Sequence, residues 1–260
     1  ISVGAYPWTI NYVPTTDTYS PLNLNLNIWF AGYTDYDWTD PLTGLRYRES
    51  FKDSSFQYFS ANFGLPSLKI GDWEIDSDIG INHYEPDSPF YDETFLDVKV
   101  RFIQDGQFFS WSPSLAIGGW YLGGRVDLDA YEHPDSSHPC FYLVESKYIF
   151  IPHFTTEISV GYMWNNFGID EEDVVMAGFS SALGTEKLWF CFDYYGGDFG
   201  AYGFSLFYYV TKNIWFQPVY FYPVERNYKA DASKFGVRKI SLKDYDSPSL
   251  WIGLYYNFEF

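Results

Sequence analysis

The 260-residue chain has few basic residues and no long apolar run. Lys and Arg number 16 against 34 Asp and Glu, which gives a formal net charge of -18. A nucleic-acid-binding protein needs a basic surface to displace counterions from phosphate, so this balance excludes nucleic acid as a partner. The longest uncharged stretch, 106–124, contains five Gly, three Ser and a Pro, with apolar residues at every second position. We therefore interpret it as a strand, and the sequence predicts no transmembrane helix.

The sequence also lacks a disulfide framework and the motifs of common cofactor sites. Its only cysteines are Cys140 and Cys191, which we expect to be independent thiols, with a bridge across the interior as the alternative. Metal-ligand spacings, P-loops and G-x-S-x-G are absent, so no cofactor is predicted. The chain starts at Ile1 without Met or a leader, and we expect that a signal peptide has been removed or omitted.

Aromatic residues are abundant instead. Phe, Trp and Tyr make up 23% of the chain. A soluble protein would have to bury these rings and satisfy the polar tip of each Tyr and Trp. At a bilayer interface the ring lies among the headgroups with its polar tip in water, so this composition favours a membrane protein.

The last strand, 250–260, alternates strictly between two faces. One face is mixed, and the other carries only apolar residues: Leu250, Ile252, Leu254, Tyr256, Phe258 and Phe260. This strand resembles the closing strand of bacterial outer-membrane β-barrel proteins, in which one face meets lipid and the other a polar interior. The resemblance implies a bacterial outer-membrane location and recognition of Tyr256, Phe258 and Phe260 by the outer-membrane assembly machinery. It points to no specific porin family.

Period-two segments predict an all-β fold, a closed antiparallel transmembrane barrel of about twelve strands. An irregular N-terminal arm, 1–20, precedes a barrel domain over 21–260. The connections alternate between short turns and long segments, as expected of short periplasmic turns and long extracellular loops. The predicted strands span 21–30, 55–64, 68–82, 93–103, 108–121, 140–151, 153–164, 173–182, 187–194, 201–211, 213–222 and 249–260.

Charged residues predicted to face the interior are the candidate site. Antiparallel pairing of 68–82 with 93–103 places Asp76 and Asp78 near Lys99 and Arg101, and a tight turn at Pro152 places Lys147 opposite Glu157. Seven carboxylates and three bases result, which favours an acidic pore lining that prefers cations. The alternative is that these pairs only cross-link the inner wall. The predicted pore-lining residues are Glu74, Asp76, Asp78, Asp97, Lys99, Arg101, Glu145, Lys147, Glu157 and Asp193.

The remaining polar and aromatic groups leave further alternatives open. The acidic loops 31–54, 83–93, 122–139 and 165–173 offer oxygen ligands for Ca²⁺ or Mg²⁺, but none has a known calcium-loop spacing, and we interpret them as solvated surface. The basic loop 223–248 either narrows the mouth or meets anionic lipopolysaccharide. Rings expected on the inner side either fill the lumen or form a stacking track for solutes: Trp120, Trp189, Tyr209, Trp251 and Tyr255.

The sequence is compatible with three functions. The first is an outer-membrane channel for small polar or cationic solutes. The second is a non-conducting scaffold that binds an envelope partner or another copy of the chain. The third is an outer-membrane lipid hydrolase, for which the segment His133–His138 supplies Ser and His. Because those groups are crowded into one loop without a known motif, the sequence favours a protein that is not an enzyme. Outer-membrane lipid and lipopolysaccharide are its expected surroundings.

Overall fold

The structure is a computed structural model in which every regular element is a β-strand, among the residues it describes. No helix in those parts is long and apolar enough to cross a membrane. The described residues are 14–33, 36–39, 46–49, 56–85, 93–123, 139–151, 154–164, 173–185, 187–196, 201–223 and 249–260.

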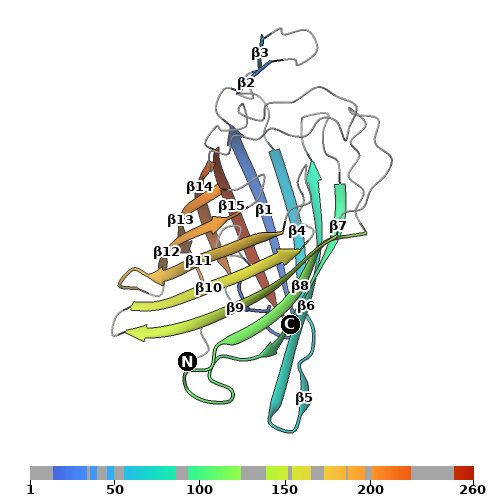
Figure 1. The fold of residues 1–260 in the computed structure, drawn as a ribbon, viewed down its shortest axis with the longest axis vertical. Helices are drawn as coiled ribbons and strands as arrows, with labels where there is room; N and C mark the ends of the chain where they lie inside the picture. Colours follow the sequence, from blue (N-terminus) through green and yellow to red (C-terminus); the bar gives the residue numbers. More distant parts are fainter. Residues whose placement is uncertain are drawn as a thin grey trace.

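Twelve strands form the wall of a barrel (Figure 1). They are β1 (Asn23–Tyr33), β4 (Phe56–Gly64), β6 (Trp73–Glu85), β7 (Glu93–Ile103), β8 (Ser114–Leu122), β9 (Cys140–Ile151), β10 (Phe154–Trp164), β11 (Val174–Ala182), β12 (Leu188–Tyr195), β13 (Ala201–Tyr209), β14 (Ile214–Pro223) and β15 (Ser249–Glu259). Three short strands lie outside the ring: β2 (Tyr36–Thr39), β3 (Arg46–Glu49) and β5 (Leu68–Ile70).

The ring closes because the first and last wall strands pair. β1 and β15 are antiparallel from Asn23 opposite Glu259 to Tyr33 opposite Ser249, and β1 also pairs with β4, which pairs with β6. The other wall strands pair in chain order, all antiparallel. Every wall strand therefore has a neighbour on each side, and no edge is left for water or another strand. The predicted closed antiparallel barrel is confirmed.

The observed strands differ from the predicted ones at two short turns. The segment 68–82 is not one strand, because Gly71 has a positive φ of 63° and folds β5 back on the start of β6. The resulting hairpin projects beyond the end of the ring (Figure 1). The strand predicted at 108 begins only at Ser114, since Gly106 and Ser112 close a turn through a 2.9 Å backbone hydrogen bond.

The wall has an apolar outer face and a buried inner face. On β10, Ile158 and Val160 point outward with 42% and 53% of their surface exposed, whereas Glu157 and Ser159 point inward with 1% each. The outward aliphatic and aromatic side chains recur on β1, β6, β13 and β15. A continuous apolar exterior of this kind is stable in hydrocarbon and costly in water, so the outer face is the lipid-facing one.

A charge on the outer face should therefore destabilise the barrel according to its depth. Leu254 lies near the middle of β15 and Leu250 at its end, and both point outward. We expect Leu254→Arg to lower the free energy of unfolding by about 2–4 kcal/mol and Leu250→Arg by about 0–1 kcal/mol. Urea unfolding of the protein in phospholipid vesicles measures both. Equal losses at the two positions would contradict this orientation of β15.

Candidate functional site

The inner face has three regions that differ in chemistry. Charged, amide and hydroxyl side chains gather on β1, β4, β6 and β7. An apolar cluster on β8–β11 contains Ala116, Cys140, Tyr142, Val144, Met163, Val174 and Met176. An aromatic cluster near the short turns of β11–β15 contains Ala182, Trp189, Cys191, Phe207, Trp215 and Tyr255.

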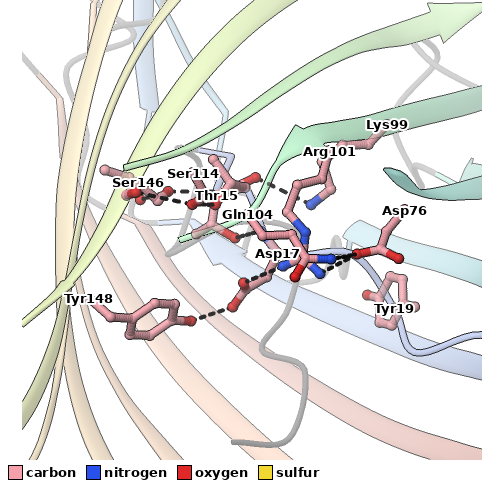
Figure 2. Close-up of polar contacts among 12 residues, drawn as sticks. Thr15, Asp17, Tyr19, Asp76, Lys99, Arg101, Gln104, Ser114, Ser146 and Tyr148 are labelled. Carbon is pink, nitrogen blue, oxygen red and sulfur yellow. Dashed lines mark hydrogen bonds and ion pairs between the residues drawn. The ribbon is translucent and has the colours of Figure 1, made fainter. Parts of the chain in front are cut away.

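Residues 14–19, which we call the arm, are buried although they belong to no wall strand. They precede the start of β1 and contact inward-facing side chains of β6, β7, β8 and β9 (Figure 2). The arm therefore lies inside the barrel, at the end that carries the short turns. The described part of the predicted N-terminal arm thus occupies the lumen.

Asp17 is the centre of the ionic contacts of the arm. Its Oδ1 is 3.4 Å from Nη1 of Arg101, and the hydroxyl of Tyr148 donates to its Oδ2. The other guanidinium nitrogen, Nη2, is 2.6 Å from Oδ2 of Asp76, which also accepts from Gln104 at 3.1 Å. One guanidinium group therefore joins a carboxylate of the arm to a carboxylate of the wall (Figure 2).

The backbone of the arm is also bound by wall side chains. Nζ of Lys99 donates to the carbonyl oxygen of Thr15 at 3.3 Å. The N–H of Thr16 donates to Oγ of Ser146 at 3.1 Å, and its hydroxyl is 2.5 Å from Oγ of Ser114. The N–H of Tyr19 donates to a carboxylate oxygen of the inward-facing Asp78 at 3.0 Å. Because buried backbone groups are costly without partners, these bonds hold the arm in one position.

Gly64 allows the arm to approach the wall closely. A Cβ at this position would lie 2.1 Å from the carbonyl oxygen of Ser20 and 2.5 Å from that of Tyr19. The carbonyl of Gly64 accepts from the N–H of Leu22 at 2.9 Å. Any other residue at position 64 forces the arm to move.

A second polar network continues along β4, β6 and β7. Tyr58 donates to the side-chain oxygen of Asn82, and Nδ2 of Asn82 donates to Asp97 at 2.5 Å. On the neighbouring strands, Ser60 donates to Asn27 at 2.7 Å. These bonds let amide and carboxylate groups remain inside a closed barrel.

The aromatic cluster fills the inner face on the other side of the barrel. The rings of Trp215 and Tyr255 stack with centroids 5.2 Å apart, and Phe207 lies 5.8 Å from Tyr255. The hydroxyl of Tyr255 donates to Gln217, which donates to Ser205. Trp189 and Tyr255, expected on the inner side, are buried in this cluster, so they pack against other rings in this state.

Charged side chains on the inner face are inaccessible to water in the state that the structure describes. Asp78 and Lys99 are 0% exposed, and Glu157 and Asp193 are each 1% exposed. The arm and the two side-chain clusters lie on the same inner face as these four residues.

The structure brings some of the predicted site residues together. Asp76 lies directly opposite Arg101 and Asp78 opposite Lys99, and the sequence predicted that these two acids and two bases lie near one another. Asp97, Glu157 and Asp193 are buried on the inner face as well.

Three predicted pore-lining residues lie elsewhere. Glu74 is in the β5–β6 hairpin beyond the ring, 3.3 Å from Lys69. Glu145 is exposed on the outer face of β9, because the residues of that strand that point inward are Tyr142, Val144 and Ser146. The pore-lining prediction is wrong for both residues.

Lys147 also points outward, so its predicted pairing with Glu157 is wrong. The residue opposite Glu157 is Tyr148, and Ile158 lies opposite Lys147. Lys147 instead binds Asp105 at 2.5 Å and the carbonyl oxygen of Ser110 at 3.0 Å. The observed pairing across the turn at 152 differs by one residue from the predicted pairing, and a difference of one residue places a side chain on the opposite face of the sheet.

Other expectations fall partly outside the described residues. His133, His138, His153, the loop 223–248 and most of the acidic loops lie there, whereas His83 contacts Thr94 at 2.9 Å. Cys140 and Cys191 are buried and form no disulfide with each other. In the described parts of the chain, no three His, Cys, Asp or Glu side chains are arranged to hold a metal ion.

Comparison with known proteins supports the fold. No protein-family model matches the sequence, and no curated protein matches it. An outer-membrane channel from Pseudomonas putida F1 has a similar structure, with a TM-score of 0.50 and 9% identity over 97% of this chain and 99% of that one. The Acinetobacter baumannii outer membrane protein Omp33 gives a TM-score of 0.47 with 9% identity, over 91% of this chain and 98% of that one. The closed ring and the likeness to the Pseudomonas channel identify the fold as that of an outer-membrane β-barrel protein.

The close approach at Gly64 predicts how the arm can be displaced. We expect Gly64→Ala to push residues 19 and 20 off the wall and to expose the arm. A cysteine introduced by Thr16→Cys should then react with a water-soluble thiol reagent at least about tenfold faster, since labelling follows the open population. Ala61→Ser, on the outer face of the same strand, is the control and should leave the rate unchanged. An unchanged rate in Gly64→Ala would show that the arm is not held against β4.

Proposed function

We propose that the protein is a channel of the bacterial outer membrane for small polar or cationic solutes, and that the arm closes it in the described state. The observation that supports this proposal is the polar wall around the arm. Side chains of β6–β9 meet backbone and carboxylate groups of a segment that is not part of the wall. Such groups replace water around a polar solute in the same way.

The charge of the interior favours cations. The buried or half-buried inward-facing ionisable residues of the wall include five acids and two bases: Asp76, Asp78, Asp97, Glu157, Asp193, Lys99 and Arg101. Carboxylates in a narrow, low-dielectric passage raise the local concentration of cations. We infer that small cations and neutral polar solutes pass more readily than anions when the arm is displaced.

The burial of charged side chains on the inner face favours a second candidate, a non-conducting scaffold. In that case the arm, the salt bridges and the aromatic cluster are permanent parts of the interior, and the loops bind an envelope protein or another copy of the chain. We propose no catalytic role, and the only histidine described, His83, bonds Thr94. The proposed surroundings are outer-membrane lipid and lipopolysaccharide, and Tyr256, Phe258 and Phe260 are the proposed assembly signal on the outward side of β15.

A reversible lock on the arm separates the two candidates. Oγ1 of Thr16 and Oγ of Ser114 are 2.5 Å apart, so cysteines from Thr16→Cys and Ser114→Cys lie within reach of a disulfide of about 2.05 Å. In planar bilayers we expect negligible conductance from the oxidised double variant and conductance at least about tenfold higher after reduction, since the arm then opens transiently.

The double variant is made with Cys140→Ala and Cys191→Ala, and Thr16→Cys alone is the control that forms no bridge. Conductance that is the same before and after reduction would contradict closure by the arm. No conductance in either state, and none after Gly64→Ala, would favour the scaffold.

The acidic interior also predicts the selectivity of the open channel. With Gly64→Ala at 0.1 M salt, the reversal potential in a KCl gradient should show cation preference, and this preference should weaken towards 1 M because the Debye length falls from about 10 Å to about 3 Å. Asp193→Asn should reduce it, and Asp105→Asn, outside the ring, should not. An anion-selective reversal potential would contradict the acidic pathway.

A further inference from the structure

We propose that the inward face of β6–β9 is a binding site for a short peptide that carries one carboxylate, and that the arm occupies this site as an intramolecular ligand. The inference rests on the proposed channel and names a class of solute for it. The site consists of Asp78, Lys99, Arg101, Ser114, Ser146 and Tyr148.

The first argument is that the site binds backbone carbonyl and N–H groups, which every peptide has. Lys99 donates to a backbone carbonyl, Ser146 accepts from one backbone N–H, and Asp78 accepts from another three residues later. These contacts do not depend on the side chains of Thr15, Thr16 or Tyr19. A different peptide in the same conformation presents the same carbonyl and N–H groups.

The second argument is the recognition of a carboxylate. Arg101 and Tyr148 approach the two oxygens of Asp17 from β7 and β9. A guanidinium and a phenol around one carboxylate give charge-assisted hydrogen bonds, which are stronger than neutral ones. Figure 2 shows that the Asp17 side chain points to both groups.

Burial makes the site selective for polar ligands. Lys99 is 0% exposed and its Nζ contacts the Thr15 carbonyl. An apolar occupant would leave this ammonium group without that acceptor and Arg101 without the carboxylate of Asp17, which is unfavourable in a closed interior. A peptide with the same groups replaces the arm without loss of these bonds.

The surrounding charge limits which peptides fit. Asp76, Asp97, Glu157 and Asp193 lie on the same inner wall, so further negative charge on the ligand is repelled. A peptide with one carboxylate side chain, a free ammonium group and an amidated carboxyl end is neutral overall. The site thus favours short, singly acidic peptides over polyacidic ones.

The tether explains why the arm must be moved before a free peptide binds. The arm joins β1 directly through residues 20–22, so its effective concentration at the site is of the order of millimolar or above. A free peptide competes poorly against it in the unmodified protein. Gly64→Ala displaces the arm near Tyr19 and Ser20 but leaves every residue of the site unchanged.

The experiment measures binding of an unlabelled pentapeptide with the sequence of residues 14–18, with a free amino end and an amidated carboxyl end. It carries the carboxylate of Asp17, and its terminal amide takes the place of the Tyr19 nitrogen, but it does not reach position 64. Isothermal titration calorimetry with the folded full-length protein in detergent should show binding to Gly64→Ala at least about tenfold tighter than to the unmodified protein. The same peptide with Asn in place of Asp should bind Gly64→Ala at least about tenfold more weakly.

Two controls identify the site. Arg101→Gln in the Gly64→Ala protein should abolish the difference between the Asp and Asn peptides, whereas Lys147→Gln, on the outer face, should preserve it. The oxidised Thr16→Cys/Ser114→Cys protein should bind neither peptide. If Gly64→Ala does not fold, as judged by heat-dependent migration in SDS, Asp17→Ala replaces it.

Three results would each overturn the proposal. They are equal affinity for the two peptides, binding that persists in the oxidised Thr16→Cys/Ser114→Cys protein, and no binding to a variant whose arm is shown by thiol labelling to be displaced. Binding does not require conduction. A protein that binds the Asp peptide selectively but never conducts would overturn the channel and leave the peptide site, whereas one that conducts without distinguishing the peptides would overturn only the peptide site.

Discussion

The structure depends on one constraint: a sheet whose outer face meets lipid must satisfy its backbone hydrogen bonds within itself. Pairing of β1 with β15 removes the last open edge, and the strict alternation of side chains then sends one set of residues to lipid and the other to the interior. A barrel of twelve strands has a narrow lumen. Every charged residue on the inner face must therefore find a partner among nearby side chains, water or an inserted segment.

The arm is such a segment. Arg101 is inward-facing and close to Asp76, and the arm supplies Asp17 as a second carboxylate. Lys99 lies opposite Asp78 and donates a hydrogen bond to the carbonyl oxygen of Thr15. The charges of the wall thus hold the arm in its position, and the arm supplies hydrogen-bond acceptors for those charges. Removal of the arm would expose the polar groups of the wall that bind it, so a closed state is compatible with the proposed transport function.

The sequence predicted the wall well because alternation is a local property. Strict period-two patterns, as in 93–103 and 250–260, identified both the strands and their two faces, and antiparallel pairing placed Asp76 and Asp78 near Lys99 and Arg101. Strand 140–151 was harder, since apolar residues such as Leu143 and Val144 occur on both of its faces. The pattern therefore did not show which residues of this strand point inward, and Glu145 and Lys147 were assigned to the inner face although they lie on the outer one.

The site of the arm could not be predicted in this way. Asp17 contacts residues 84 and 131 positions away, and its segment has no periodicity that indicates a direction. The run Thr15–Thr18, rich in short hydrogen-bonding side chains, and the glycine at position 64 were the available signals. Neither identifies a partner without the three-dimensional arrangement, because the lumen that unites them exists only after the ring has closed.

Amide hydrogen exchange at Thr16 and Tyr19 tests the central claim, that the arm is hydrogen-bonded inside the lumen, most directly. Both N–H groups donate to buried wall side chains, so they should exchange at least about a hundredfold more slowly than an unstructured peptide of the same sequence. Exchange at the unprotected rate for both amides, in a protein whose wall strands remain protected, would contradict the account.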